Sequence, residues 1–450
     1  MPPAVPATST IFALSSGQGR AGVAVIRISG PQAGPILDAM AAPRPRPRFA
    51  AFRRIRHPAS GDLLDEALVL FFPAPRSETG EDMAELQVHG SGAVIRATLA
   101  ALATFSSCRL AEPGEFARRA FENGHLDLTA AEGLADLVDA ETEAQRKQAL
   151  AQAGGALAKL YDAWREALLE VRALLEAAID FSDEADVAAD ATSRALARAA
   201  ELRREIAAHL DDGHRGEIVR DGFRVVLAGP PNVGKSSLLN ALARRNAAIV
   251  SDEPGTTRDI IDVRLDLAGY AVVVSDTAGV RETAAAVERE GIRRTFGQAR
   301  AADLVLWVMD ASAPEPPVPD LIKDGEARIL PVLNKIDLVP GHPHDGSPAH
   351  ALRVSCRTGD GLPTLVAAIA NEVQTRLGTV SQAIPSQIRH RRGLEACLQA
   401  LDRALAADPA EIELRAEDLR QAADALGRIV GRVDPEEVLG IIFGRFCIGK

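Results

Sequence analysis

Apolar residues recur along this chain with several different spacings, and the first spacing is mixed. Short apolar runs at 23–28, 67–72 and 85–90 predict strands, and three-to-four spacing at 93–105 predicts a helix. The Pro-Arg repeat at 43–48 predicts a loop, because proline fits neither a helix interior nor a central strand. We therefore expect a small α+β domain over residues 1–118.

From residue 119 to 215 the apolar spacing becomes helical. One stripe runs from Leu157 through Trp164 to Ile179, and a second covers 196–210. Thr129 and Glu132 have the spacing of a capping box, which predicts a helix start there. These stripes are typical of the core of a helix bundle.

Short apolar runs then alternate with helical segments over residues 216–378. This alternation predicts a mostly parallel α/β sheet, with one antiparallel pair joined by a turn at Ala268-Gly269. The runs that predict strands are 223–228, 260–267, 271–275, 304–310, 329–334 and 352–354.

Residues 379–450 return to helical spacing, with stripes at 394–405 and 419–430 and a helix start near Asp434-Pro435. An α/β unit with helices on both sides predicts an insertion. We expect a Ras-like P-loop domain with a mixed six-stranded sheet (216–378), inserted in an all-helical domain (119–215 and 379–450) that follows the α+β domain.

Composition limits the classes of protein that fit. The 450 residues are 47% hydrophobic and 25% charged, and no apolar run approaches the ~20 residues of a membrane span. The start of the chain lacks the features of a secretory signal, and the four cysteines form no CxxC pair, so we expect a cytoplasmic protein.

The net charge of −11 means that any contact with nucleic acid must come from a local patch. Residues 389–392 are one candidate, although most such clusters are solvated helix starts.

The stretch from Gly229 to Ser237 follows an apolar run and precedes a helical one, which is the context in which GxxxxGK[ST] binds phosphate. Its glycines let backbone N–H groups approach phosphate oxygens. Lys235 is placed to reach the β- and γ-phosphates, and Ser236 to hold Mg²⁺.

Asn334-Lys335-Ile336-Asp337 follows a predicted strand and favours guanine. Its aspartate can accept hydrogen bonds from N1–H and the 2-amino group of guanine, which adenine does not offer in that arrangement. Ser355-Cys356-Arg357 lies where a second loop contacting the base belongs.

Two further elements lie between the phosphate loop and the guanine motif. Asp276-Thr277-Ala278-Gly279 ends a predicted strand, and we expect its aspartate near Mg²⁺ and its glycine N–H at the γ-phosphate. A threonine within residues 255–259 can complete the coordination of Mg²⁺. Val280 stands where many GTPases carry a glutamine that orients water; Glu282 and Glu288 are the nearby carboxylates, each more often a solvated charge.

These motifs, together with the segments Gly22–Gly30, Thr79–Asp82, Glu112–Phe116, Ala177–Phe181 and the Phe-Cys-Ile-Gly-Lys sequence at 446–450, closely resemble the tRNA modification GTPase family MnmE, also called TrmE. The resemblance covers essentially the whole chain. It implies a GTPase that forms a carboxymethylaminomethyl group on the wobble uridine of tRNA with an FAD-containing partner, MnmG. It also implies a homodimer formed through the N-terminal domain, which binds 5-formyltetrahydrofolate or a related one-carbon folate, and a heterotetramer with MnmG. Potassium is implied to bridge two GTPase domains in place of an arginine finger.

The resemblance assigns residues by matching positions. It implies Asn232, Ser251, Glu253 (through its backbone) and Thr256 for potassium, Ser236 and Thr257 for Mg²⁺, and Glu288 as the residue that orients water. For folate it implies Arg27, Glu85 and Lys450, with His125 where the family often has lysine; Cys447 is as consistent with a half-buried apolar role as with a functional one. The other residues expected to contact GTP are Gly229, Val233, Gly234, Lys235, Ser237, Asp276, Thr277, Ala278, Gly279, Asn334, Lys335, Asp337, Ser355, Cys356 and Arg357.

Two other classes of protein share part of this pattern. A ribosome-assembly GTPase has the same guanine motifs but carries an RNA-binding module, and no GXXG loop in a βαβ context is present. A folate-binding scaffold does not need the phosphate loop or Glu288, and GTP turnover separates it from an enzyme.

Overall fold

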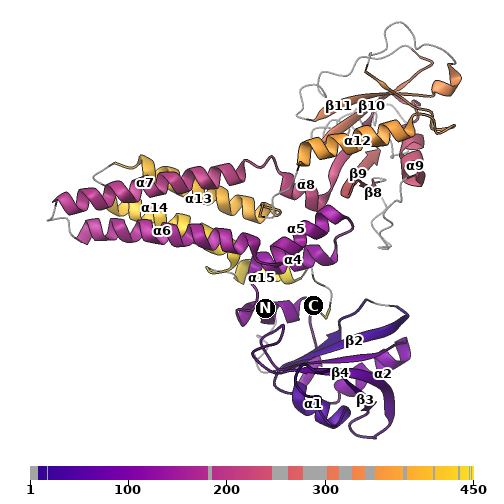
Figure 1. Ribbon diagram of the computed structural model, residues 1–450, viewed down its shortest axis with the longest axis vertical. Helices are drawn as coiled ribbons and strands as arrows, with labels where there is room; N and C mark the ends of the chain where they lie inside the picture. Colours follow the sequence, from indigo (N-terminus) through magenta and orange to yellow (C-terminus); the bar gives the residue numbers. More distant parts are fainter. Residues whose placement is uncertain are drawn as a thin grey trace, which may run out of the picture. The chain divides into compact units, whose positions relative to one another are not determined.

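The computed structural model describes residues 9–17, 19–180, 185–245, 262–276, 302–313, 327–339, 350–378, 383–408, 411–433, 436–444, 446 and 448–449 (Figure 1). The chain divides into two compact units. One comprises Met1–Ala135, Ala153–Ala191 and Asp408–Lys450, and the other comprises Asp136–Gln152 and Thr192–Ala407. Among the described residues, no helix is both long enough and apolar enough to cross a membrane.

The first unit contains a six-stranded sheet in the order β3-β4-β5-β2-β1-β6. All neighbouring pairs are antiparallel except β1 and β6, which run parallel. The three strands expected from the sequence are present, and three more were not expected: β1, β3 and β6. The bounds are β1 Thr10–Leu14, β2 Ala21–Ser29, β3 Ala51–Arg56, β4 Leu63–Phe72, β5 Met83–Gly90 and β6 Cys108–Leu110.

One face of this sheet holds the core of the α+β region. Helices α1 (Ala33–Met40) and α2 (Gly92–Leu102) pack on it, and Ile26, Ile28 and Val69 are fully buried there. Strand β3 is at the edge of the sheet, where Ile55 is buried while Phe52 and Arg54 are exposed. Ile55 therefore anchors β3 in the core, while the face that carries Phe52 and Arg54 is turned to solvent.

The second unit contains the other six-stranded sheet, in the order β12-β11-β10-β7-β9-β8. The β8–β9 pair is antiparallel and turns at Ala268-Gly269, both with positive φ, and every other neighbouring pair is parallel. The mixed sheet expected from the sequence is thus confirmed. The strands are β7 Phe223–Ala228, β8 Asp262–Leu267, β9 Tyr270–Asp276, β10 Leu304–Asp310, β11 Arg328–Asn334 and β12 Leu352–Arg353.

Apolar clusters cover both faces of this sheet, as a mostly parallel sheet requires. Helices α8 (Arg215–Asp221), α9 (Lys235–Arg245) and α12 (Leu362–Leu377) contribute to the larger cluster, which includes Val219, Leu238 and Leu365. A short 3₁₀ turn, η1 (Ile336–Leu338), follows β11.

Helices before and after the nucleotide region pack together, which confirms the expected insertion. In the first unit α6 (Ala156–Asp180) packs along α14 (Ile412–Val430), and α3 (Glu115–Glu122) packs on α15 (Glu436–Phe443). In the second unit Arg203 of α7 (Ala185–Leu210) binds Asp402 of α13 (Ile388–Ala406), with Nε 2.5 Å from Oδ1. The expected domain limits at 118, 215 and 378 stay predictions.

Two shorter helices, α4 (Leu128–Val138) and α5 (Glu143–Ala153), complete the helical part. Helix α4 begins at Leu128, one residue before the start expected at Thr129, and a different residue caps it. Asp127 Oδ1 accepts from Ala130 N–H at 2.9 Å and from the Thr129 hydroxyl at 2.6 Å. An aspartate two residues before the threonine therefore caps the helix.

Candidate nucleotide-binding site

The phosphate loop lies between β7 and α9, and two of its glycines have no room for a side chain. Gly229 has φ +147°, and a Cβ there would lie 2.2 Å from the carbonyl oxygen of Val308. Gly234 has φ +94°, and a Cβ there would lie 2.4 Å from Asn334 Nδ2. These positions require glycine both for the backbone angle and for the close approach of neighbouring elements.

Lys235 begins α9, and its side chain turns back into the phosphate loop. Its ammonium donates to the carbonyl oxygens of Gly229 at 2.9 Å and Pro230 at 2.8 Å. Burial lowers the pKa of Lys235, and attraction to Asp276 offsets part of that effect. On the side of the phosphate loop, the Lys235 ammonium is held by neutral carbonyl oxygens that leave its charge uncompensated. This side is therefore suited to bind a phosphate.

Ser236 and Asp276 meet at the end of the phosphate loop, as expected for two groups that share one metal ion. The Ser236 hydroxyl donates to the Asp276 carboxylate, which is buried at the end of β9. A hydroxyl and a carboxylate oxygen are the hard ligands that Mg²⁺ prefers, so this pair fits the ion.

Asn334 connects the phosphate loop to the second base loop. Its side chain is 1% exposed, and Nδ2 donates to the carbonyl oxygen of Val233 at 2.8 Å. Oδ1 accepts from the backbone N–H of Cys356 at 3.4 Å and from its thiol at 3.3 Å. The asparagine thus fixes two loops that are distant in sequence, a structural role that precedes any contact with a base.

Asp337 is the residue expected from the sequence to accept guanine, and both of its oxygens have partners. Oδ1 accepts from the Ser355 hydroxyl at 2.6 Å, and Oδ2 lies 2.8 Å from Arg357 Nη2. The hydrogen bond from Ser355, assisted by attraction to Arg357, lowers the pKa of Asp337. The carboxylate is therefore held ionised, as an acceptor of two N–H groups must be.

Asp310 is a member of the site that the sequence did not indicate. It ends β10, and Lys335 Nζ lies 2.6 Å from its Oδ2 and 2.8 Å from the carbonyl oxygen of Asn232. Burial would raise the pKa of Asp310, but hydrogen bonds from Lys335 and Ser312 outweigh it and lower the pKa. The sequence did carry one indication of Asp310: it ends β10, the strand that pairs with β7, and side chains at the carboxyl ends of neighbouring parallel strands lie at the same edge of the sheet.

The structure therefore brings together all of the expected nucleotide residues that it describes. Asn232 is exposed with φ +65°, Val233 is buried, and Ser237 is exposed on α9. Several expected residues lie outside the described residues, so their assignments stay predictions: Ser251, Glu253, Thr256, Thr257, Thr277, Ala278, Gly279, Glu288, Cys447 and Lys450.

The expected folate residues lie in the first unit. Arg27 pairs with Glu85 (Nε to Oε1, 3.1 Å) and with Glu78 (Nη1 to Oε2, 2.8 Å). A Cβ on Gly80, two residues from Glu78, would lie 3.0 Å from Cδ2 of His125. Arg27 and Glu85 are thus in contact, and His125 lies against the same loop.

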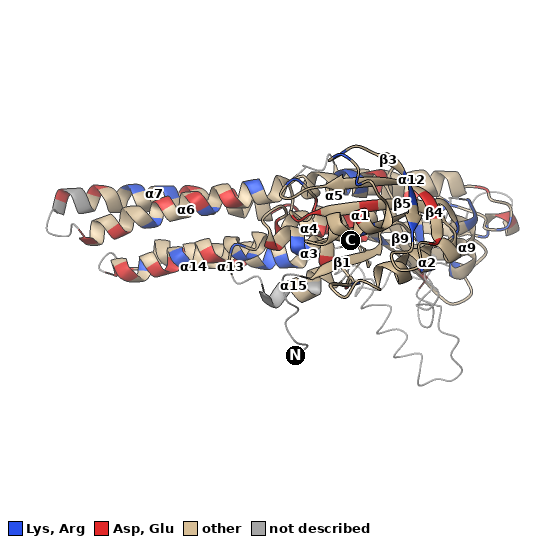
Figure 2. Cartoon of the chain, turned by 90° about the horizontal axis from the view of Figure 1, so that it is seen from below, with Lys and Arg blue, Asp and Glu red and all other residues tan. Residues whose placement is uncertain are grey.

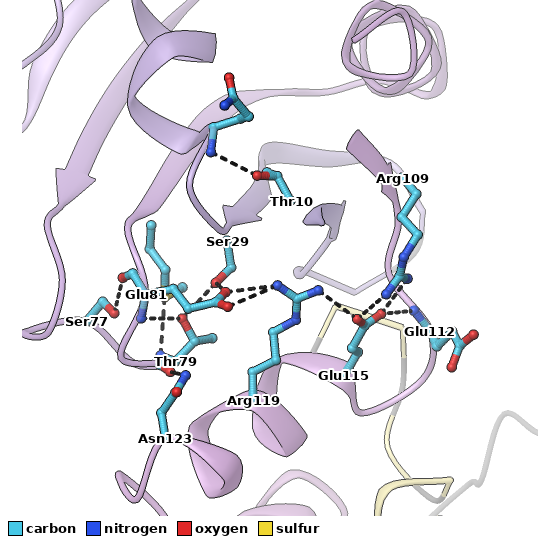
Figure 3. A network of polar contacts seen from close by, with 12 residues as sticks. Thr10, Ser29, Ser77, Thr79, Glu81, Arg109, Glu112, Glu115, Arg119 and Asn123 are labelled. Atoms are coloured by element: carbon cyan, nitrogen blue, oxygen red, sulfur yellow. Dashed lines mark hydrogen bonds and ion pairs between the residues drawn. The ribbon is translucent and has the colours of Figure 1, made fainter. Parts of the chain in front are cut away.

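The loop that carries Glu78 and Gly80 is supported by a buried polar network (Figure 3). Arg119 donates to both oxygens of Glu81, at 3.2 and 3.0 Å, and to Glu115 at 3.0 Å. Glu81 also accepts from the Ser29 hydroxyl at 2.7 Å. Asn123 donates to the carbonyl oxygen of Thr79 at 2.7 Å, so α3 and its end hold this loop in place.

Residues near 450 reach the same unit. Pro113 and Ile448 form an antiparallel bridge, and the Ser15 hydroxyl donates to the carbonyl oxygen of Gly449 at 2.8 Å. The C-terminal motif is therefore anchored beside β1 and the start of α3.

Two members of the cluster at 389–392 are withdrawn from solvent, while Arg392 is exposed. His390 is fully buried, and Arg391 is committed to three acceptors: Asp212 at 2.6 Å, Glu217 at 3.2 Å and the carbonyl oxygen of Leu210 at 2.9 Å. These contacts join the segments that enter and leave the nucleotide region. The residues begin a helix, in agreement with the more ordinary interpretation.

Comparison with known proteins gives matches over the full chain. Residues 128–447 match the model described as the MnmE helical domain, and residues 10–125 match the model described as the GTP-binding protein TrmE N-terminus. Among solved structures, the G domain of the T. maritima FeoB iron transporter aligns with 34% of this chain and 99% of its own, at 26% identity and a TM-score of 0.25.

Curated relatives named tRNA modification GTPase MnmE are identical to this chain at about half of the aligned positions. The protein of Methylorubrum populi is 54% identical over 98% of both chains, and that of Parvibaculum lavamentivorans is 52% identical over 98% of this chain and 100% of its own. That of Maricaulis maris is 51% identical over 98% of this chain and 100% of its own. With relatives of this identity over their full length and a family model that covers most of the chain, the chain belongs to the MnmE family of tRNA modification GTPases.

Proposed function

We propose that this GTPase acts in the modification of the wobble uridine of tRNA, in the cytoplasm. It would help to form a carboxymethylaminomethyl group at uridine C5 as a homodimer in complex with the FAD protein MnmG. The observation that carries this proposal is the full-length similarity to relatives named tRNA modification GTPases. The sequence at 446–450 adds a feature outside the nucleotide motifs.

The chain's own residues divide the work on GTP into binding and orientation. Asp337 accepts N1–H and the 2-amino group of guanine once Arg357 has moved from its oxygen. Lys335 stays bound to Asp310 and to the carbonyl oxygen of Asn232 in the phosphate loop. The segment that reads the base is therefore linked directly to the loop that binds the phosphates. Lys235 exchanges its loop carbonyls for phosphate oxygens.

Ser236, Asp276 and Thr257 would hold Mg²⁺, which supplies charge neutralisation between the β- and γ-phosphates. Glu288 would orient the attacking water, because Val280 has no group that can do so. The side chain of Asn232 is exposed beside the phosphate loop, while its carbonyl is fixed by Lys335. We assign it to potassium, with Ser251, Glu253 and Thr256, where two GTPase domains meet.

The folate proposal rests on Arg27, Glu85 and His125, with Lys450 as the fourth member. The Arg27–Glu85 pair offers both a cation and an acceptor to 5-formyltetrahydrofolate. His125 stands where the family often has lysine, and an imidazole is not a permanent cation as a lysine ammonium is. We therefore expect a weaker contact with a carboxylate at this position than lysine would give.

The decisive test is analysis of the wobble nucleoside in tRNA from cells that lack this protein. We expect the carboxymethylaminomethyl group to be absent and to return with the wild-type gene. The Lys235→Ala variant, which cannot reach the phosphates, should fail to restore it. Normal wobble nucleosides in the deletion strain would refute the proposed function.

A further inference from the structure

We propose that the outer edge of the N-terminal sheet is a docking surface for the single-stranded part of the tRNA. We call this surface the β3 edge and define it by Arg46, Arg48, Phe49, Phe52, Arg53, Arg54 and Arg56. The proposal rests on the proposed function, because it supplies a contact surface for the substrate of that function.

The first observation is local charge in an acidic protein. The whole chain has a net charge of −11, yet residues 39–61 contain six arginines and no aspartate or glutamate. Two carboxylates from outside this stretch pair with Arg44 and Arg54. The β3 edge therefore concentrates positive charge where a polyanion can approach, against the sign of the molecule as a whole.

The second observation is how the other arginines are held. Among the described residues, Arg48, Arg53 and Arg56 donate hydrogen bonds to carbonyl oxygens: those of Arg76, of Pro43 and Phe52, and of Gly61. Arg48 also lies over the ring of Phe72, 5.8 Å from its centroid. A carbonyl orients a guanidinium without neutralising it. These side chains are thus positioned and keep their charge, as phosphate-binding arginines must.

The third observation is the presence of exposed aromatic side chains among these arginines. Phe49 is 66% exposed and Phe52 is 61% exposed. Phe52 lies opposite Leu68 on the solvent face of β3 and β4, and Arg54 lies two residues further along the same face. Arginines for phosphates beside an aromatic platform for a base are the combination found in single-strand RNA binding.

A groove gives this surface its shape. It has a volume of about 550 Å³ and runs between the end of α1 and β3. Its lining consists of Ala39, Met40, Ala42, Pro43, Phe52, Arg53, Arg54, Arg56 and Glu66.

The distribution of charge elsewhere in the chain favours this location. Acidic and basic side chains are mixed along α6, α7, α13 and α14, so these long helices present no surface of one sign (Figure 2). The stretch 389–392 offers a smaller positive surface, because Arg391 is paired and His390 is buried. Protection of a sheet edge against aggregation explains arginines on β3, but it does not explain exposed phenylalanines between them.

The test measures binding of an unmodified tRNA transcript to the full-length protein by fluorescence anisotropy over a range of KCl concentrations. We expect Arg53→Gln/Arg56→Gln, which removes two arginines held by carbonyl oxygens, to reduce the slope of log K against log salt by about 1.4. This change corresponds to about 25-fold in affinity between 1 M and 0.1 M salt. Phe52→Ala should lower affinity about 5- to 100-fold without changing the slope. The matched control is Arg20→Gln/Arg96→Gln, which removes two exposed arginines of the same unit and should leave both quantities unchanged.

GTP turnover is measured for each variant to separate a loss of tRNA binding from a loss of GTPase activity. We expect turnover to stay at the wild-type value. Equal loss of affinity in the groove variants and the control variant would overturn the proposal, as would an unchanged salt slope in Arg53→Gln/Arg56→Gln. A change in the molecular mass of the free protein with Phe52→Ala would instead identify a second copy of this chain as the occupant. If the groove variants bind tRNA like the wild type, the docking proposal is wrong, but the wobble modification can still depend on this protein.

Discussion

Arg119 is the residue whose removal most sharply tests the polar network of the N-terminal region. Its side chain is 9% exposed and serves two carboxylates, Glu81 and Glu115, which are 19% and 10% exposed. Breaking a buried ion pair by removing one partner costs about 3–5 kcal/mol, because the other charge is left without compensation. The contacts that remain to Glu81 and Glu115 reduce this cost.

The remaining contacts reduce the cost at one carboxylate much more than at the other. Glu115 keeps Arg109, at 2.7 and 2.5 Å, and the N–H of Glu112 at 3.0 Å. Glu81 keeps the Ser29 hydroxyl but loses the cation that bound both of its oxygens. We therefore expect Arg119→Met to destabilise this region by about 2–3 kcal/mol, below the full range for a buried pair.

The assay is hydrogen exchange followed by mass spectrometry on the full-length protein, read over peptides from residues 10–125. Arg118→Met is the matched control: this neighbouring arginine is 52% exposed and pairs with Glu122, so its loss should cost less than about 0.5 kcal/mol. Adding Glu81→Gln to Arg119→Met should recover about 1–2 kcal/mol, because it removes the stranded charge. Equal effects of the two arginine variants, or no recovery in the double variant, would refute this reasoning.

Four further outcomes are expected. Asp337→Asn should exchange guanine for xanthine preference in nucleotide binding, and a variant still selective for GTP would contradict the contact assigned to Asp337. Glu288→Ala should bind GTP normally but lose most hydrolysis, and normal turnover would remove Glu288 from the mechanism. Potassium should stimulate hydrolysis and sodium should not, because the ions differ in size; equal rates in both salts would argue against the bridging cation. Burial would raise the pKa of Glu115, but the bonds from Arg109, Glu112 and Arg119 lower it below the 4.5 of a free glutamate, so this stabilisation is complete above pH 4.5 and is lost as pH falls through the lower folded pKa. Protection factors in the N-terminal region, each the intrinsic exchange rate divided by the observed rate at the same pH, should therefore fall below pH 4.5, and constant protection factors would contradict this account.

Much of the nucleotide site was predictable because its residues follow strands. The carboxyl ends of parallel strands meet at one edge of a sheet, so Gly229, Asp276 and Asn334 had to lie near each other once β7, β9 and β11 were assigned. Asp310 follows the same rule at the end of β10 but belongs to no short motif, and it was missed.

Other features depend on contacts that sequence spacing does not encode. Strand β3 has three arginines in six residues and lies at an edge, so it lacks the apolar alternation that marks a half-buried strand. The pairing of Arg119 with Glu81 spans 38 residues and requires the packing of α3 against the sheet loops. A polar network of this kind can be identified only after the chain has been folded in three dimensions.

The anchoring of Gly449 to Ser15 has a consequence for the synthesis of this protein. The two residues are 434 positions apart, and a ribosome that adds about 5–20 residues per second needs roughly 20–90 s to pass from one to the other. During that interval the N-terminal region must exist without the strand-like contact at Pro113. Any ligand that depends on that contact can therefore bind only to a chain whose translation has passed residue 449, so the order of synthesis sets the order in which the site forms.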